Sequence, residues 1–207
     1  LEYDSYPAEY EAVFESNTSQ KAFEEDVLLA GFGSAPTKNE GSAVSYDDAG
    51  QQWTARYQHE TVALAFSITE EAEEDGQYGS IASRYTKALA RSMASTKEIK
   101  AANVLNNATS VNIGDGTTLL STSHPTQNGN QSNTLATAAD LSETSLEAIL
   151  IQIADMKDER GLRIAAQGTQ LVIPTAYTFV AERLLESQLR TGTADNDINA
   201  IKSGGYL

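Results

Sequence analysis

The sequence predicts an α+β fold that combines a projecting β-hairpin, one long helix and a smaller layer of helices around a strand. Three patterns carry this prediction. Apolar residues alternate before residue 69, which is typical of a strand, and recur at helical spacing from about residue 80 to 107. After residue 145 a helical pattern, a short apolar run and a second helical pattern follow one another, and this order favours an α/β layer.

The predicted hairpin spans residues 26–68. Its first limb is Val27–Gly33, and its middle, Ser34–Gly50, contains Pro36, Gly41 and many small polar residues, a composition typical of a mobile loop. The returning limb is Trp53–Ile68, with one apolar face formed by Val62, Leu64, Phe66 and Ile68. Because that face turns polar toward Trp53, we expect the strand to be anchored at Ile68 and to reach into solvent, or toward a partner, at Trp53.

The long helix is predicted from near Ser80 to near Asn107. With a rise of roughly 1.5 Å per residue, it would span about 40 Å. It follows an acidic cluster, Glu70–Asp75. Such a cluster could bind a hard cation, but negative charge is also ordinary at the start of a helix. We favour the second interpretation and predict no metal site.

The flanking regions are less regular. Residues 1–25 show no sustained period, although Glu9–Phe14 could form a short helical turn. Residues 111–140 are predicted as short strands and loops. A helix is expected at 145–159, with Thr144 and Glu147 as its capping pair and Gly161 at its end. A buried strand at 171–173 and a helix opening at Pro174 complete the predicted layer.

Composition excludes several classes of protein. The chain has 207 residues, no cysteine and a net charge of −15 from 29 acidic and 14 basic residues. Disulfides and thiolate metal sites are therefore impossible, and the charge argues against a nucleic-acid-binding surface, because phosphate contacts need Lys and Arg. No apolar run is long enough to cross a bilayer. The first residue is Leu1 and not Met, so we expect a processed protein or part of a longer gene product.

Three stretches carry a resemblance to a known family. They are the run from His59 to Gly79 (HETVALAFSITEEAEEDGQYG), Leu119–Pro125 (LLSTSHP) and Gln170–Ser187 (QLVIPTAYTFVAERLLES). In this order they resemble the major capsid proteins of tailed bacteriophages with the Hong Kong 97-type fold, and most closely the Mu-like major head subunits. The similarity runs from about Asp26 onward.

The resemblance implies a fold and a function. It implies an N-terminal arm (1–25), an extended β-hairpin loop (26–68), a peripheral domain with the long spine helix (69–140) and an α/β axial domain (141–207). Members of the family continue past this point, so we expect the axial domain to be incomplete. The implied function is a structural protein that assembles in the host cytoplasm into hexamers and pentamers. These close the icosahedral shell of the virion around double-stranded DNA, without cofactors or a membrane.

Further partners are implied by the same resemblance: scaffold, portal and decoration proteins. The acidic charge has two interpretations that both remain open. An acidic wall would repel packed DNA instead of adhering to it, or the charge simply keeps the protein soluble.

Six residues are predicted to contact neighbouring subunits: Tyr3, Tyr6 and Tyr10 in the arm, and Trp53, Arg56 and Tyr57 on the loop. Aromatic side chains on exposed segments need a partner to bury them. For Trp53, packing within its own hairpin is the equal alternative. Lys38 near the loop tip occupies the kind of position at which some members of the fold form cross-links, but we expect an ordinary solvated lysine.

Three other functions fit parts of the sequence. An encapsulin-like compartment shares the implied fold without phage DNA, and a monomeric binding module would stay monomeric at all concentrations. The enzymatic alternative is a hydrolase centred on His124, with Ser121 or Ser123 as nucleophile and a distant carboxylate. Because the sequence has no nucleophile-elbow pattern, we expect no enzyme.

Overall fold

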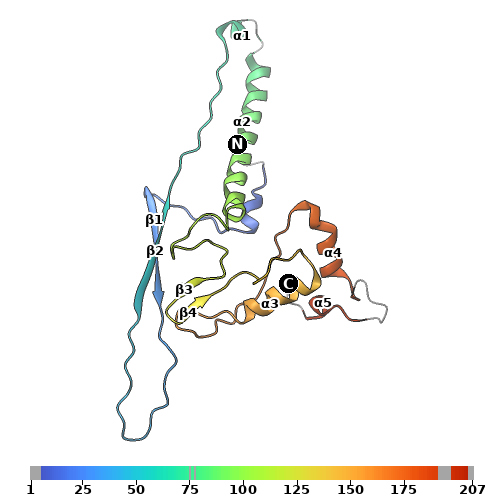
Figure 1. Ribbon diagram of the computed structural model, residues 1–207. Helices are drawn as coiled ribbons and strands as arrows, with labels where there is room; N and C mark the ends of the chain where they lie inside the picture. The colour runs from blue at the N-terminus through green and yellow to red at the C-terminus, as the bar shows by residue number, and fades with distance from the viewer. Residues whose placement is uncertain (1–5, 75, 77, 191–196, 205–207) are drawn as a thin grey trace. The chain divides into compact units, whose positions relative to one another are not determined.

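The computed structural model describes residues 6–74, 76, 78–190 and 197–204. Contacts divide the chain into two compact units (Figure 1). Unit 1 comprises Leu1–Asp26 and Ala55–Val111, and unit 2 comprises Val27–Thr54 and Asn112–Leu207. The boundaries fall within strands β1 (Phe23–Ala30) and β2 (Gly50–Gln58), which pair as a two-stranded sheet, so each unit contains part of this hairpin.

Unit 1 is built around helix α2, Tyr78–Asn106, which contains 29 residues. At the ordinary helical rise its length is about 44 Å. Its many alanines favour a helix, and the hydroxyls of Thr86 and Thr96 donate to the carbonyls of Ala82 and Ser92 one turn earlier. The prediction of a helix from 80 to 107 is confirmed. Contrary to expectation, the acidic run before it does not lie at the start of this helix but forms a separate short helix, α1 (Glu70–Glu74), and the first turn of α2 contains no acidic residue.

The returning limb of the hairpin is shorter than predicted. β2 ends at Gln58, and the last backbone hydrogen bond to the first limb runs from the His59 N–H to the Ala22 carbonyl. The prediction of a strand reaching Ile68 is wrong, because the partner strand begins at Phe23 and offers no further pairing. Residues 59–69 run beside α2 instead (Figure 1), where the Phe66 ring meets Tyr85 edge-on at 5.6 Å. Their alternating apolar face is therefore not part of a sheet: Phe66 contacts the helix, while Leu64 stays 57% exposed.

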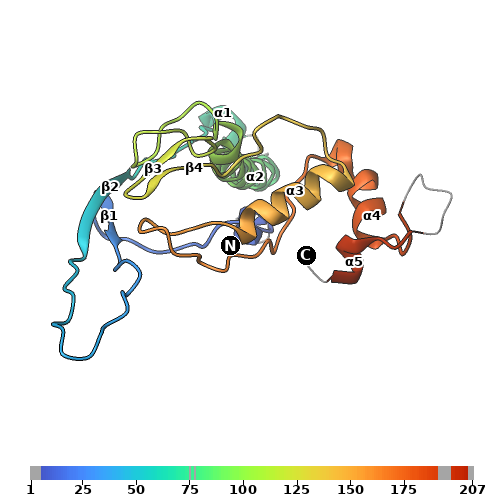
Figure 2. The same ribbon diagram turned by 60° about the horizontal axis from the view of Figure 1, so that its bottom comes forward.

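Within its described residues, unit 2 contains a second small sheet and three helices. The sheet pairs β3 (His124–Thr126) with β4 (Gly129–Gln131) in antiparallel register, and an isolated bridge joins Asn112 to Thr118. This confirms the short strands predicted for 111–140. The helices are α3 (Glu143–Ala154), α4 (Thr178–Glu186, after the 3₁₀ turn η3, Thr175–Tyr177) and α5 (Ala200–Gly204). Figure 2 shows α4 beside α5. The predicted helix after Pro174 is confirmed.

The predicted ends of α3 are wrong. The helix begins at Glu143 because Ser142 has extended backbone angles and exchanges hydrogen bonds with Ser145, which makes these two residues the capping pair instead of Thr144 and Glu147. It ends at Ala154 and not at 159. The Asp158 carboxylate accepts the backbone N–H groups of Arg160 and Leu162, and such local bonds compete with a helix.

The strand predicted at 171–173 is also absent from the described structure. The two sheets pair β1 with β2 and β3 with β4, and residues 171–173 belong to neither. Val172 is 55% exposed, so the short apolar run is not the buried strand that its composition predicted.

The core is small. Within the described residues, the buried apolar side chains are Ala30, Ala108, Leu146, Ala181, Leu184 and Ile201. Half of them are alanines, and no large side chain in the described ranges is fully buried. Much apolar surface is therefore left uncovered in the single chain.

Candidate functional site

The loop between β1 and β2, residues 31–49, exposes large apolar side chains. Tyr46 is 95% exposed and Leu29, at the end of β1, is 72% exposed, while Phe32 and Val44 are also mostly in solvent. We call these four side chains the loop surface. Large apolar side chains that are this exposed are candidate contacts with a partner. None of the four was predicted as a contact from the sequence, although Phe32 and Tyr46 stand out as aromatics within a run of glycine, serine and alanine.

A single carboxylate ties this loop to the rest of unit 2. Asp47 accepts the Gly33 backbone N–H at 2.8 Å, and the Arg160 Nη2 lies 2.6 and 2.7 Å from its two oxygens. The Gly33 N–H and the Arg160 guanidinium together hold the pKa of Asp47 below its ordinary value. The Arg160 Nη1 donates to Gln127 Oε1 at 2.9 Å, which links the loop to the turn between β3 and β4.

The predicted contact residues on the hairpin have different surroundings. Arg56 donates from Nε to Glu25 at 2.7 Å. Its guanidinium also lies 4.4 Å from the centre of the Phe23 ring, so it is bound within its own hairpin. Trp53 is half-buried. Tyr57 is 56% exposed, and its ring has surface available for a partner. Contact with a neighbouring subunit stays a prediction for Trp53, Arg56 and Tyr57.

The arm lies against α2 of the same chain. The 3₁₀ turn η2, Glu9–Ala12, agrees with the short helical turn expected there. Glu98 of α2 accepts the backbone N–H groups of Glu9 and Tyr10 at 2.9 and 3.1 Å, and the Lys97 ammonium lies 4.7 Å from the centre of the Tyr10 ring. Tyr6 is half-buried, and Tyr3 lies outside the described residues. Tyr10 thus has an intrachain partner, and its predicted contact with a neighbour remains untested.

His124 belongs to a hydrogen-bonded cluster. Its Nδ1 lies 2.6 Å from Asp115 Oδ2 and 3.1 Å from the Thr117 hydroxyl, which in turn donates to Asp115. The Asp115 side chain is only 2% exposed. Burial raises the pKa of Asp115, but the hydrogen bonds from His124 and Thr117 outweigh it, and the net pKa is lowered. The cluster fixes the turn at 113–118 against β3.

The serines proposed for a hydrolase are not bonded to this histidine. The Ser121 hydroxyl accepts the Ser123 N–H at 3.1 Å, and the Ser123 hydroxyl accepts the Asn130 amide at 2.7 Å. The outer nitrogen of His124, Nε2, is buried and has no hydrogen-bond partner among the described residues. A histidine and a carboxylate are present, but the nucleophile of a triad is not in place. The sequence suggested the histidine and not Asp115, whose proximity depends on the turn.

Glu159 of unit 2 is half-buried, and one of its carboxylate oxygens is fully enclosed. Its Oε2 lacks a hydrogen-bond partner in the part of the chain that the structure describes. Burial raises the pKa of Glu159, and the charges of Asp158 and Asp115 raise it further, against the opposing effect of a hydrogen bond from the Gln127 backbone.

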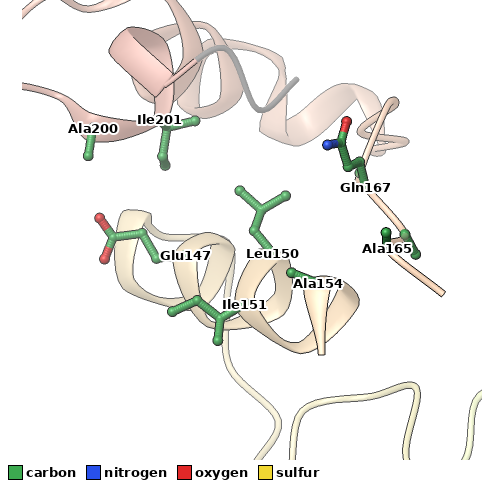
Figure 3. A pocket seen from close by; sticks show the side chains of 10 residues that line it. Glu147, Leu150, Ile151, Ala154, Ala165, Gln167, Ala200 and Ile201 are labelled. Atoms are coloured by element: carbon green, nitrogen blue, oxygen red, sulfur yellow. The ribbon is translucent and has the colours of Figure 1, made fainter. Parts of the chain in front are cut away.

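An open cavity of about 720 Å³ lies between α3, residues 165–168 and α5. Figure 3 shows Leu150 of α3 and Ile201 of α5 on opposite sides of it, with Glu147 and Gln167 at its edges. The lining is mainly aliphatic, and few polar groups converge on it, unlike a catalytic site.

Across the described ranges, no three His, Cys, Asp or Glu side chains are grouped so that they could hold a metal ion. The same residues include no helix with the length and apolar character needed to cross a bilayer. Within this part of the chain, the best candidates for function are the exposed apolar side chains of the loop surface and the Asp47–Arg160 ion pair that ties their loop to unit 2.

Residues 51–206 match the phage capsid protein family. The chain belongs to this family. Searches of curated proteins and of solved structures gave no match. As a phage capsid protein, the chain has a structural role in the virion, and its exposed apolar side chains are candidate contacts between capsid components.

Proposed function

We propose that this capsid protein is the major head subunit of a tailed bacteriophage, with the Hong Kong 97-type fold of the Mu-like subunits. Copies of the chain would assemble into hexamers and pentamers that close an icosahedral shell around double-stranded DNA. The observation that carries the proposal is the loop surface: within a chain of the capsid family, a loop with a 95% exposed tyrosine is suited to contact a second copy.

The small core supports self-association. Apolar side chains along α2 are largely in solvent, including Tyr85, Ile99 and Val104. Fully burying a large apolar side chain is worth about 1.5–3 kcal/mol, so neighbours that cover several of them would stabilise the subunit substantially. Because each subunit would bury surface against several neighbours at once, it would be held in the shell more tightly than any one of these interfaces could hold it.

The regions have distinct roles in this proposal. Residues 1–25 are the arm, 26–68 the extended loop, 69–140 the peripheral domain with α2 as its spine, and 141–207 part of the axial domain. The net charge of −15 suits a wall that contains DNA without binding it. Scaffold, portal and decoration proteins would be further partners during assembly in the host cytoplasm.

The loop surface gives a direct test. The double variant Val44→Ser/Tyr46→Ser removes two exposed apolar side chains, and Val44→Ile/Tyr46→Phe is the matched control that keeps them apolar. Because both side chains are exposed in the single chain, both variants should fold like the wild type. If each lost contact costs about 1.4 kcal/mol, the concentration needed for assembly rises about tenfold per contact.

Assembly is measured by light scattering and by the fraction of protein that sediments as particles. We expect the serine variant to assemble poorly and the control to assemble like the wild type. Equal assembly of the serine variant and the wild type would contradict a role for the loop surface.

A further inference from the structure

The ion pair between Asp47 and Arg160 joins residues that are far apart in the sequence. The two Asp47 oxygens lie 2.6 and 2.7 Å from the same Arg160 nitrogen, so the guanidinium faces both oxygens of the carboxylate. Both residues belong to unit 2. Charge-assisted hydrogen bonds of this length are the stronger kind in proteins.

Arg160 projects from a well-braced turn. The Asp158 carboxylate accepts the backbone N–H groups of Arg160 and Leu162, and the Gln131 amide donates to the Asp158 carbonyl at 3.2 Å. An antiparallel bridge between Lys157 and Arg163 closes the turn. These bonds fix the backbone of Arg160, and so the point from which its side chain extends.

Asp47 in turn joins the two limbs of the loop. Its carboxylate accepts the N–H of Gly33, on the outgoing limb, while Asp47 itself lies on the returning limb. A β-carbon at Gly33 would lie 3.4 Å from Arg160 Nη2 and from Asp47 Oδ2, at the short end of van der Waals contact, which shows how closely the loop backbone approaches the pair. The Asp47 carboxylate thus joins both limbs of a loop that has no helix or strand of its own among residues 31–49, and Arg160 holds that carboxylate.

We infer that Arg160 is a positioning residue for assembly: through Asp47 it holds residues 31–49 in one arrangement, so that the loop surface is already ordered when a second copy arrives. This inference rests on the proposed function. Without the pair the loop would sample many conformations, and each contact with a neighbour would first have to order it. Aspartate and arginine are both charged throughout the neutral range, so the pair stays ionised there.

The experiment compares Arg160→Gln, Asp47→Asn and the double variant. The matched control is Arg163→Gln, since Arg163 lies in the same turn but pairs with Asp155 at 2.9 Å and not with the loop. The first readout is limited trypsin cleavage of the unassembled protein after Lys38, the one lysine or arginine in residues 31–49. The second readout is the rate of assembly, followed by light scattering.

We expect cleavage after Lys38 to be up to about fivefold faster in Arg160→Gln and Asp47→Asn, because cleavage follows the population of the open loop and a partly exposed ion pair shifts that population only modestly. The double variant should match the single ones, since the two side chains act as one contact. The control should be cleaved like the wild type. All three variants of the pair should assemble more slowly than the control, with unchanged circular dichroism.

Unchanged cleavage in both single variants, or an equal increase in Arg163→Gln, would overturn the inference. Faster cleavage with unchanged assembly would overturn the positioning role. If the wild type itself never assembles, the proposed function fails, but the cleavage readout still decides whether Arg160 orders the loop.

Discussion

Asn199 connects two helices of unit 2, and its replacement tests how unit 2 is held together. The side chain is buried. Its Nδ2 donates to the carbonyls of Leu184 and Ser187 at 2.7 and 3.0 Å, at the end of α4, and its Oδ1 accepts the Ile201 N–H at 3.1 Å, in the first turn of α5. Both the nitrogen and the oxygen of this amide are thus used.

The loss of stability expected when this amide is removed follows from the number of hydrogen bonds that it makes. Asn199→Ala leaves two carbonyls and one N–H without partners, and at about 1 kcal/mol for each net hydrogen bond the loss is about 3 kcal/mol. For a chain of this size that corresponds to a fall in Tm of about 6–12 °C. Asn199→Asp should cost more at neutral pH, because a carboxylate would face the Leu184 and Ser187 carbonyls in a buried site.

The aspartate variant also has a predicted pH dependence. Burial without a cation partner raises the folded-state pKa of such a carboxyl. The loss of stability caused by the aspartate is therefore complete above its raised folded-state pKa. It declines as the pH falls toward about 3.9, the pKa of an aspartate in the unfolded chain, because the protonated acid can again donate one hydrogen bond.

Stability is measured by urea and thermal unfolding, followed by circular dichroism, with hydrogen exchange of the α4 and α5 amides to localise the effect. Asn103→Ala, at an exposed position on α2, is the control and should be close to neutral. If Asn199→Ala lies within about 0.5 kcal/mol of the wild type, the assigned hydrogen bonds do not stabilise this unit.

Three more substitutions test separate parts of the structure. Glu98→Ala removes the acceptor of two arm N–H groups, so chymotrypsin should cleave after Tyr10 faster; an unchanged rate would mean that the arm is not held there. Glu159→Gln should raise the free energy of unfolding at neutral pH, since the pKa of this acid is raised in the folded state. This gain in stability should vanish when the pH falls below 4.5, the ordinary pKa of a glutamate. A loss of stability at pH 7 would contradict the raised pKa. Gly161 has a φ of +88°, and a β-carbon there would meet the Asn128 amide. Forcing a side chain into this left-handed conformation costs roughly 1–2 kcal/mol, so Gly161→Ala should lower stability in urea by about that amount. No change would show that the turn adapts.

Sequence patterns predicted the elements whose causes are local. Helix α2 follows from apolar spacing and alanine content within one segment, and α4 follows from Pro174 at its start. α2 begins at Tyr78, close to its predicted start, and α4 begins at Thr178, directly after the 3₁₀ turn η3 that Pro174 precedes. In each case the information needed to form the helix is contained in the helix and its first turn.

Features that depend on distant residues were not predicted. The extent of β2 depends on where β1 begins. The end of α3 was also missed although its cause is local, because the Asp158 side chain binds backbone N–H groups two and four residues further on. The pairing of Asp47 with Arg160 spans 113 residues, and nothing near either position indicates the other. The candidate site was predicted only in part: Arg56 and Tyr57 lie on the hairpin as expected, but the most exposed large apolar side chain among the described residues, Tyr46, belongs to the loop itself.

Negative-stain electron microscopy of the protein, beside its size-exclusion profile, tests the central claim most directly. The account predicts closed shells or rings of capsomers formed by this one chain. A folded monomer at every concentration, with no particles even when a scaffold protein is supplied, would contradict it.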